Sequence, residues 1–216
     1  MMRMLRVECI PVGRLLSNSY LLYDPELGDG IIIDAGDDAE KIIKIVDERG
    51  VEVKGIYLTH GHFDHVLGVR DLKEDLGCGF YIHEGDAAIL SQAPADAKYF
   101  LDVEVDPPPE PDEWIFDGQI LRVGDHNVRV IHTPGHTPGS VCYLAEEMIF
   151  TGDTLFAGSI GRTDLPGGSL QSLLSSISAK ILSLPDHYAV YPGHGPSSTI
   201  GAEKMLNPFL RFMRDR

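Results

Sequence analysis

Short apolar segments alternate with longer amphipathic ones along most of the chain. The apolar segments are four to six residues long and are bounded by Gly, Pro, Asn or Asp, which is typical of buried strands. They are Val7–Val12, Tyr20–Tyr23, Ile31–Asp34, Gly55–Thr59, Phe80–His83, Ile120–Val123, Val128–His132, Ser140–Leu144, Met148–Thr151 and Tyr188–Tyr191. Helices are predicted at Ala39–Arg49, Val66–Leu76, Gly85–Ser91, Leu170–Leu182 and Ser198–Arg211. The alternation predicts an α/β fold with two mixed sheets and helices outside them.

Two segments show how local sequence sets these boundaries. In Ala39–Arg49 the apolar residues follow helical spacing, Asp37 or Asp38 is placed to cap the start, and Gly50 is placed to end the helix. The segment from Ala93 to Pro111 contains Pro94 and a run of three prolines, which predicts a long irregular loop. Such a loop either covers a site as a lid or forms a rigid surface connection.

Composition limits the possible classes of protein. The chain has 216 residues, of which 43% are hydrophobic and 24% charged, and we expect one domain over residues 1–216. The formal net charge is −15, and there is no arm rich in Lys and Arg. A chain of this charge is poorly suited to hold a polyanion. The expected partner is therefore a small molecule and not a nucleic acid, with the protein a monomer or small homo-oligomer.

Cysteine usage and hydropathy bear on location. The three cysteines, Cys9, Cys78 and Cys142, show no paired spacing, which favours a reducing compartment over a disulfide scaffold. The first eight residues lack the apolar core of a signal peptide. No stretch approaches the 18 apolar residues of a membrane span. We expect a cytoplasmic protein that does not enter a membrane, which also disfavours a secreted antibiotic-degrading enzyme.

The most informative string is Thr-His-Gly-His-Phe-Asp-His at residues 59–65. It places four strong metal ligands directly after a predicted strand: His60, His62, Asp64 and His65. Side chains alternate along extended chain, so His60, His62 and Asp64 project to one side, while Asp64 and His65 point in different directions. One short segment can thus serve two metal ions. Imidazole and carboxylate without thiolate suit zinc, iron(II) or manganese(II).

Three further ligand candidates stand in similar positions. His136 lies in Thr-Pro-Gly-His-Thr-Pro-Gly, Asp153 in Thr-Gly-Asp-Thr, and His194 in Tyr-Pro-Gly-His-Gly. Each follows a short apolar strand and a turn that contains glycine. Active sites of layered α/β proteins are commonly built from such loops, because rigid strands hold the loops in register.

In order and context, these motifs resemble those of the metallo-β-lactamase-fold hydrolases. Asp34, at the end of Ile-Ile-Ile-Asp-Ala-Gly, matches the early aspartate of that family, and the resemblance extends from about Asn18 to Phe209. The segments Gly158–Asp164 and Glu203–Phe209 look like the short glyoxalase-II-like (hydroxyacylglutathione hydrolase-like) group. The resemblance implies an αββα sandwich.

The resemblance also implies a distribution of ligands over two divalent metal ions. His60, His62 and His136 would hold the first ion, and Asp64, His65 and His194 the second. Asp153 would bridge both, and Asp64 and Asp153 are the candidate catalytic carboxylates. Asp34 would accept a hydrogen bond from a ligating histidine; its alternative role is that of a plain turn residue. Zinc is the expected metal, with iron or manganese as alternatives.

Two bridged ions predict a metal-dependent hydrolase in which a hydroxide held between the ions is the nucleophile. A thioester suits this chemistry, because a thiolate departs without much help from a general acid. The sequence shows no Gly-x-Ser-x-Gly motif and no evident Cys–His pair. Only 22 residues follow His194, fewer than the glutathione-holding helical region of full-length glyoxalase II, so the thiol carrier stays open.

Two alternatives of other classes remain. A persulfide dioxygenase would bind one iron through His60, His136 and Asp153. A metal-binding protein without catalytic activity is the second. Arg162 either contacts an anionic substrate or pairs with Asp164. The other histidines, His83, His126, His132 and His187, are expected to be bystanders, and Cys142 and Tyr143 to belong to a core strand.

Overall fold

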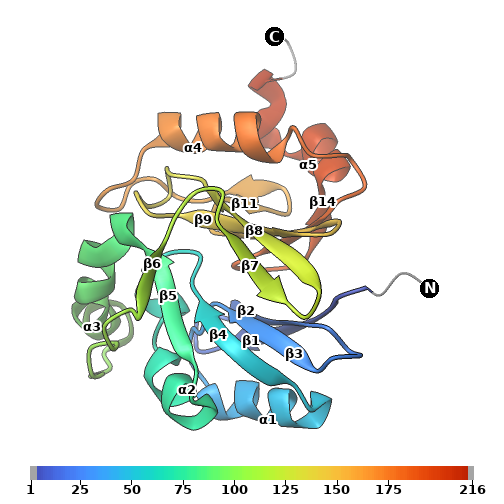
Figure 1. Ribbon diagram of the computed structural model, residues 1–216. Helices are drawn as coiled ribbons and strands as arrows, with labels where there is room; N and C mark the ends of the chain where they lie inside the picture. Colours follow the sequence, from blue (N-terminus) through green and yellow to red (C-terminus); the bar gives the residue numbers. More distant parts are fainter. Residues whose placement is uncertain (1–3, 214–216) are drawn as a thin grey trace.

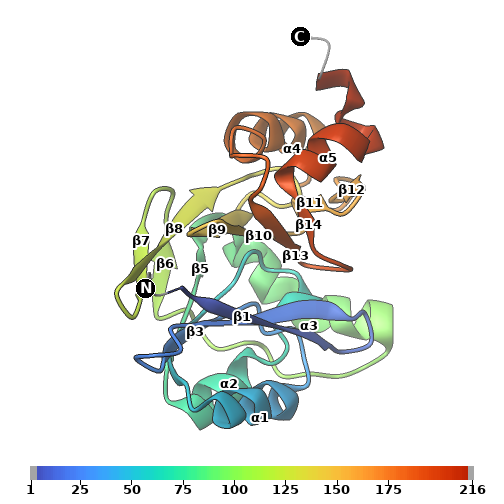
Figure 2. The same cartoon turned by 90° about the vertical axis from the view of Figure 1, so that its right-hand side faces the viewer.

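The computed structural model describes residues 4–213, and its elements form four layers. The outer limits of the predicted domain, residues 1–3 and 214–216, lie outside the described residues. Two sheets face each other, with α1 (Ala39–Arg49) and α2 (Val69–Leu76) on one outer side and α4 (Leu170–Ser176) and α5 (Ile200–Leu206) on the other (Figure 1, Figure 2). This is the predicted αββα sandwich.

The first sheet is built from the N-terminal half of the chain. Its strands follow chain order: β1 (Arg6–Val12), β2 (Ser17–Tyr23), β3 (Asp29–Ile33), β4 (Glu52–Tyr57), β5 (Gly79–His83) and β6 (Glu113–Ile115). The first three strands pair antiparallel, and β3 through β6 pair parallel. The parallel strands therefore all end at one edge of the sheet, where β4 leads into the histidine-rich segment.

The second sheet comes from the C-terminal half. In spatial order it contains β14 (Ser198–Thr199), β13 (Ala189–Pro192), β10 (Met148–Gly152), β9 (Val141–Ala145), β8 (His126–His132) and β7 (Ile120–Val123). Only β10 and β13 pair parallel, while β8–β9 and β9–β10 pair antiparallel. Strands β8, β10 and β13 thus run in the same direction. Their ends bring the loops of His136, Asp153 and His194 to one edge of the sheet.

Alternation along the strands explains why three apolar layers form. In β3, Ile31 and Ile33 face the second sheet, whereas Ile32 faces the layer under the helices. The layer between the sheets also holds Tyr143 and Phe150, both fully buried. Tyr143 and Cys142 are buried in β9, as predicted.

Several helix boundaries differ from the predicted ones. Helix α3 spans Ala87–Leu101 and passes through Pro94, so the first part of the predicted loop from residue 93 is wrong. Leu90, Ala93 and Ala97 bury one face of α3 in the core, and this packing outweighs the missing N–H of the proline. Within this part of the chain, between the end of α3 and the start of β6, residues 102–112 are irregular.

Smaller differences follow from local chemistry. The predicted helix at residues 170–182 continues beyond α4 as a π-helical turn (Ile177–Ile181), and the predicted helix at 198–211 ends at Leu206, just before Pro208. Asp38 precedes α1 without a capping hydrogen bond from its side chain, and Gly50 ends that helix in the left-handed region as predicted. The structure adds the hairpin of β11 (Leu155–Phe156) and β12 (Ser159–Ile160). Within residues 4–213, no helix is both long and apolar enough to cross a membrane.

Candidate metal centre

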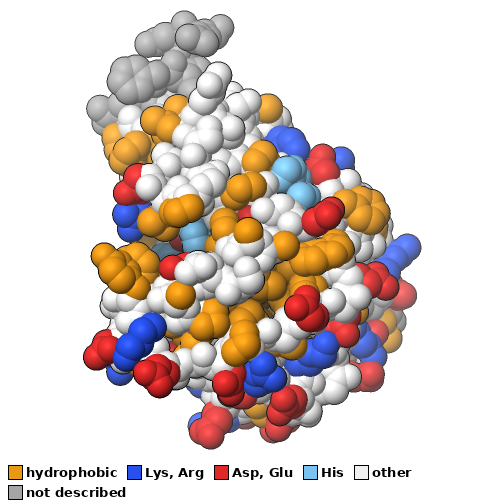
Figure 3. Space-filling model, turned by 90° about the vertical axis from the view of Figure 1, so that its left-hand side faces the viewer, with side chains coloured by type: hydrophobic (Ala, Val, Ile, Leu, Met, Phe, Trp, Pro, Cys, Tyr) orange, Lys and Arg blue, Asp and Glu red, His pale blue; other side chains and the backbone are white. Residues whose placement is uncertain are grey.

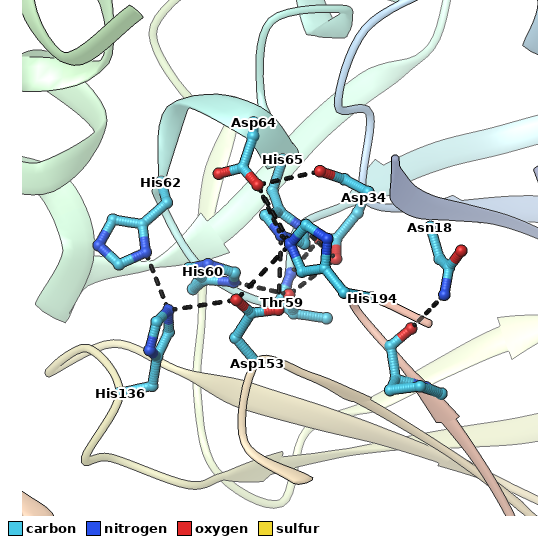
Figure 4. Close-up of polar contacts among 12 residues, drawn as sticks. Asn18, Asp34, Thr59, His60, His62, Asp64, His65, His136, Asp153 and His194 are labelled. Atoms are coloured by element: carbon cyan, nitrogen blue, oxygen red, sulfur yellow. Dashed lines mark hydrogen bonds and ion pairs between the residues drawn. The ribbon is translucent and has the colours of Figure 1, made fainter. Parts of the chain in front are cut away.

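The structure brings all seven predicted ligands together where the edges of the two sheets meet (Figure 4). His60 and His62 follow β4 in extended chain, and the short 3₁₀ helix Phe63–His65 then turns Asp64 and His65 toward the same point. The main chain links the halves directly, since the Val141 N–H donates to the Thr59 carbonyl at 2.8 Å. The centre is therefore held by both sheets.

The first ligand group consists of His60, His62 and His136, as the sequence predicted. The Nδ1 of His62 lies 2.9 Å from the Nε2 of His136. The other ring nitrogen of His136, Nδ1, lies 2.8 Å from the Arg162 carbonyl oxygen and so donates to it. This hydrogen bond fixes the tautomer of His136 and leaves its Nε2 with a lone pair that faces the centre.

The second group consists of Asp64, His65 and His194. The Nε2 of His194 lies 3.1 Å from the Oδ2 of Asp64 and 3.3 Å from the Nε2 of His65. Ser17 donates a hydrogen bond of 3.0 Å to the same carboxylate oxygen of Asp64. The loop of His194 is held in turn by Asn18, whose amide donates to the carbonyls of Pro192 and Gly195, each at 2.9 Å.

Asp153 lies between the two groups. Its Oδ2 is 3.6 Å from the Nε2 of His136, and its Oδ1 is 3.5 Å from the Nε2 of His65. The Oδ2 also lies 3.8 Å from the Nε2 of His194, so the carboxylate approaches ligands of both groups, as a bridging ligand requires. His60 also forms a compact group with His65 and Asp153.

A direct observation shows that these residues fit bound metal. Among the described residues, the Nε2 of His60 and the Oδ1 of Asp153 are buried without a hydrogen-bond partner. Buried polar atoms are rarely left unpaired, and a metal ion bound at the centre would give both of these atoms a partner. Two ligands of one tetrahedral zinc ion lie roughly 3.3 Å apart, and the distances between the ligand atoms above agree with that value. The nitrogen and oxygen donors also suit iron and manganese.

The electrostatics differ between the two groups. Burial lowers the pKa of His62 to about 4, with a further contribution from His136. Burial and the neighbouring histidines also lower the pKa of His60. Both imidazoles are therefore neutral near pH 7, as metal ligation requires. At His65 burial acts in the same direction, but the charges of Asp64 and other carboxylates outweigh it and raise the pKa to about 10.

Asp34 acts behind the ligands through three hydrogen bonds. Its carboxylate accepts from the Thr59 N–H at 2.7 Å, from the Thr59 hydroxyl at 2.8 Å and from the Nδ1 of His65 at 2.9 Å. Because the Thr59 hydroxyl donates to Asp34, it accepts from the Nδ1 of His60, 3.0 Å away. Asp34 thus orients two ligand candidates. The predicted hydrogen bond to a histidine is present, and the alternative of a plain turn residue is wrong.

Sequence reasoning missed Asp86. Its carboxylate is fully buried and accepts from the Gly61 N–H at 2.8 Å, between His60 and His62. It also accepts from the Thr137 hydroxyl at 2.7 Å and the Gly139 N–H at 2.6 Å, in the loop of His136. Asp86 therefore joins the two loops of the first ligand group. One signal was available: it is an acidic residue in a glycine-containing turn just after a strand, as Asp153 is.

The remaining candidates lie outside the centre. Arg162 pairs with Asp164 through two hydrogen bonds of 2.8 and 2.7 Å, as one of the two alternatives predicted. None of the four other histidines belongs to a ligand group among the described residues. His126 pairs with Glu146 and His187 with Glu147, while His83 stacks on His132.

A cleft of about 990 Å³ opens above the centre. Its floor includes His62, Asp64, His136, Asp153 and His194. The walls come from α3, from Leu15 in the turn between β1 and β2, and from Leu165 and Pro166 in the segment after β12. In Figure 3, pale-blue histidine atoms lie deep in a hollow, with hydrophobic side chains beside it. A small molecule in this cleft would reach the ligand groups directly.

Comparison with known proteins agrees with this description. A family model for the metallo-beta-lactamase superfamily matches residues 12–194. The hydroxyacylglutathione hydrolase GloC of Haemophilus influenzae is 40% identical over 210 residues, which cover 95% of this chain and 98% of that protein. The crystal structure of the BLEG-1 B3 metallo-beta-lactamase has a TM-score of 0.89 and 38% identity, covering 95% of this chain and 100% of that one. The structure of TTHA1623 in a di-iron-bound form has a TM-score of 0.85 and 37% identity, with 94% and 100% covered.

The fold and the clustered ligands together define an αββα protein with a candidate metal centre between its two sheets. The chain belongs to the metallo-beta-lactamase superfamily. The family and the fold predicted from the motifs are thereby confirmed.

Proposed function

We propose that this protein is a hydrolase with two divalent metal ions that cleaves thioesters of small molecules. The observation that carries the proposal is the position of Asp153, whose carboxylate approaches His136 of one ligand group and His65 and His194 of the other. His60, His62 and His136 would hold one ion, and Asp64, His65 and His194 the other, with Asp153 shared. Zinc is the expected metal; the di-iron form of TTHA1623 makes iron the first alternative.

When bound, the ions supply a water of lowered pKa and an electrophilic contact for the substrate carbonyl. The protein's own residues hold the geometry. Asp34 accepts from the Nδ1 of His65 and the Arg162 carbonyl from the Nδ1 of His136, so the Nε2 of each ring is turned toward the centre. The carboxylates Asp64 and Asp153 lie at the floor of the cleft, next to any bound acyl group. Hydrolysis breaks the C–S bond and adds water, giving a carboxylic acid and a thiol.

The composition of the cleft supports an attack by water. Among the described residues that line it there is no Ser, Thr, Cys or Lys, so the lining offers none of the usual nucleophiles for an acyl-enzyme. A thioester fits because its thiolate needs little protonation to leave. The relative GloC carries the name of a thioester hydrolase, which supports the same class of substrate. The cytoplasmic location stays a prediction.

Metal content tests the proposal. We expect about two metal ions per chain by elemental analysis and hydrolysis of a simple acyl thioester by the same preparation. Replacing Asp153 by Ala should lower the metal content and reduce kcat/KM by more than the roughly 10–100-fold that loss of an outer hydrogen-bond partner costs. Asp186→Ala is the matched control, because that carboxylate pairs with Lys204 at the surface.

Other results would contradict the proposal in distinct ways. One iron per chain, with oxygen consumed only when a persulfide is supplied, would establish the dioxygenase alternative. Two metals without turnover of any thioester would leave a metal-binding protein of another function. Full activity of Asp153→Ala would show that the carboxylate does not bridge two ions.

A further inference from the structure

Apolar and aromatic side chains form much of the wall of the cleft above the metal centre. Helix α3 presents Ile89, Tyr99 and Phe100 to it, and Leu15 and Leu165 lie on other parts of the lining. Tyr99 is 82% exposed and Phe100 is 51% exposed. Large side chains left open to water beside a reactive centre indicate a surface that an apolar ligand covers.

This wall is connected to the ligand groups by packing. The ring of Phe100 stacks on that of Phe63, with 5.8 Å between centroids and 9° between planes. Phe63 directly precedes Asp64, and Tyr99 packs edge-on against Phe100 at 4.9 Å. The aromatic residues therefore hold a fixed position relative to the metal centre, and a substrate that contacts them is oriented above the carboxylates.

The walls of the cleft away from the ligand groups offer no free positive charge to an anionic carrier. Apart from the candidate ligand histidines, Arg162 is the only basic side chain among the described lining residues, and Asp164 already occupies its guanidinium through two hydrogen bonds. Outside the ligand groups the lining also contains the carboxylate of Asp96, and the whole chain has a formal net charge of −15. The part of a glutathione or phosphate-bearing carrier that extends beyond the metal ions would therefore bring carboxylate or phosphate groups against walls without a free cationic side chain to pair with them.

We infer that the substrate is an uncharged thioester with a medium-length aliphatic or aryl acyl group, and that Ile89, Tyr99 and Leu165 bind that group. This inference rests on the proposed thioester hydrolysis and narrows it to one substrate class. It also makes these three residues determinants of specificity, which contact the acyl group and not the reacting atoms.

Four synthetic thioesters test the inference on the metal-loaded protein. The hexanoyl and acetyl thioesters of N-acetylcysteamine differ only in the acyl chain, and the same acyl groups on glutathione add the charges. We expect kcat/KM to be about tenfold or more higher for hexanoyl than for acetyl on the neutral carrier, because the added methylenes bury apolar surface. We expect the glutathione thioester to be the poorer substrate for each acyl group.

Variants locate the preference in the cleft. Ile89→Ser alters the wall formed by α3 and Leu165→Ser the segment after β12, and each should reduce the ratio of hexanoyl to acetyl activity at least about threefold. Leu206→Ser is the matched control, since this exposed leucine lies on α5 outside the cleft lining. Asp164→Asn should free Arg162 and raise activity on the glutathione thioester selectively.

The outcomes separate the two proposals. If none of the four thioesters is hydrolysed, the proposed function fails. If all are hydrolysed with equal efficiency, or glutathione thioesters are preferred, the function stands and the apolar-substrate inference is wrong. An unchanged hexanoyl-to-acetyl ratio in both wall variants would also overturn the assignment of these residues.

Discussion

Individual carboxylates behind the ligands determine how the centre is held, and Asp86 is the clearest case. Its two oxygens accept hydrogen bonds from three groups in two different loops. In Asp86→Asn, one oxygen becomes an NH₂ group that faces a backbone N–H. We expect the free energy of unfolding to fall by about 1–3 kcal/mol and the metal content of the first ligand group to decrease.

Equilibrium unfolding in urea, with metal analysis of the same samples, measures both effects. Asp102→Asn is the control. Asp86 directly precedes α3 and Asp102 directly follows it, but the carboxylate of Asp102 pairs with Lys98 at the surface. Exposed pairs of this kind contribute little to stability. If both variants kept the same stability and metal content as the parent, Asp86 would not hold the two loops together.

At this scale the sequence pointed to the seven side chains that the structure brings together, but not to most of the residues that support them. Strand alternation predicted that Asp64 lies beside His60 and His62 and points away from His65. This expectation is wrong, because residues 63–65 form a 3₁₀ helix that turns Asp64 and His65 toward the same ligand group. Asp86 and Thr59 act through contacts with loops far away in the chain, and Asp86 lies 51 residues from Thr137. No local pattern contains such contacts, which arise only when segments distant in the chain pack together.

The loops that carry the ligand candidates pack so closely that some of their positions have no room for a side chain, as the loop after β13 shows. A Cβ at Gly193 would lie 2.2 Å from the Oδ1 of Asp153 and 2.9 Å from the ring of His65. We therefore expect Gly193→Ala to displace the carboxylate of Asp153 and to lower the metal content. The value of kcat/KM should fall by at least about 100-fold.

Gly195, two residues further on, provides a matched comparison. It has a φ of +75°, and nothing lies within 4 Å of an added Cβ. Gly195→Ala should therefore cost only about 1–2 kcal/mol of stability from left-handed backbone strain and retain the metals. Elemental analysis of the two variants distinguishes the effects, and equal metal loss in both would show that backbone strain alone is responsible.

Helix α3 shows why part of the fold was not predictable from local signals. Pro94 and the following prolines predicted a loop, but the buried face of Leu90, Ala93 and Ala97 keeps the chain helical through Pro94. In contrast, Ala39–Arg49 was predicted to the residue, because its apolar spacing and Gly50 agree with its environment. Local and tertiary preferences coincide in α1 and conflict in α3.

This conflict gives a prediction for stability. Pro94→Ala restores an N–H that can bond to the Leu90 carbonyl within the helix. Alanine in a helix interior is favoured over proline by about 3 kcal/mol, while proline lowers the entropy of the unfolded chain by about 0.4–1 kcal/mol. We expect a net gain of roughly 2–2.6 kcal/mol in the urea-unfolding free energy. A loss of stability would show that contacts of the proline ring outweigh the helix hydrogen bond.

For the whole molecule, the metal centre joins the two halves of the sandwich. His60, His62, Asp64 and His65 follow a strand of the first sheet, whereas His136, Asp153 and His194 follow strands of the second. Each predicted ion takes ligands from both sheets, because His136 approaches His62 and Asp153 approaches His65. Bound metal therefore stabilises the packing of one sheet against the other, in addition to any role in catalysis.

Metal removal tests this link. Ligands present at about 1,000 times their Kd stabilise the folded state by about 4 kcal/mol, and each kcal/mol shifts Tm by about 2–4 °C in a chain of this length. Chelation should therefore lower Tm by roughly 10 °C, and restored metal should reverse the shift. Asp153→Ala should show a smaller shift, because it loses a ligand common to both groups. If metal joins the two halves, the protein cannot lose its ions without weakening the contact between the sheets. An identical Tm with and without metal would therefore mean that the sheets pack independently of the centre.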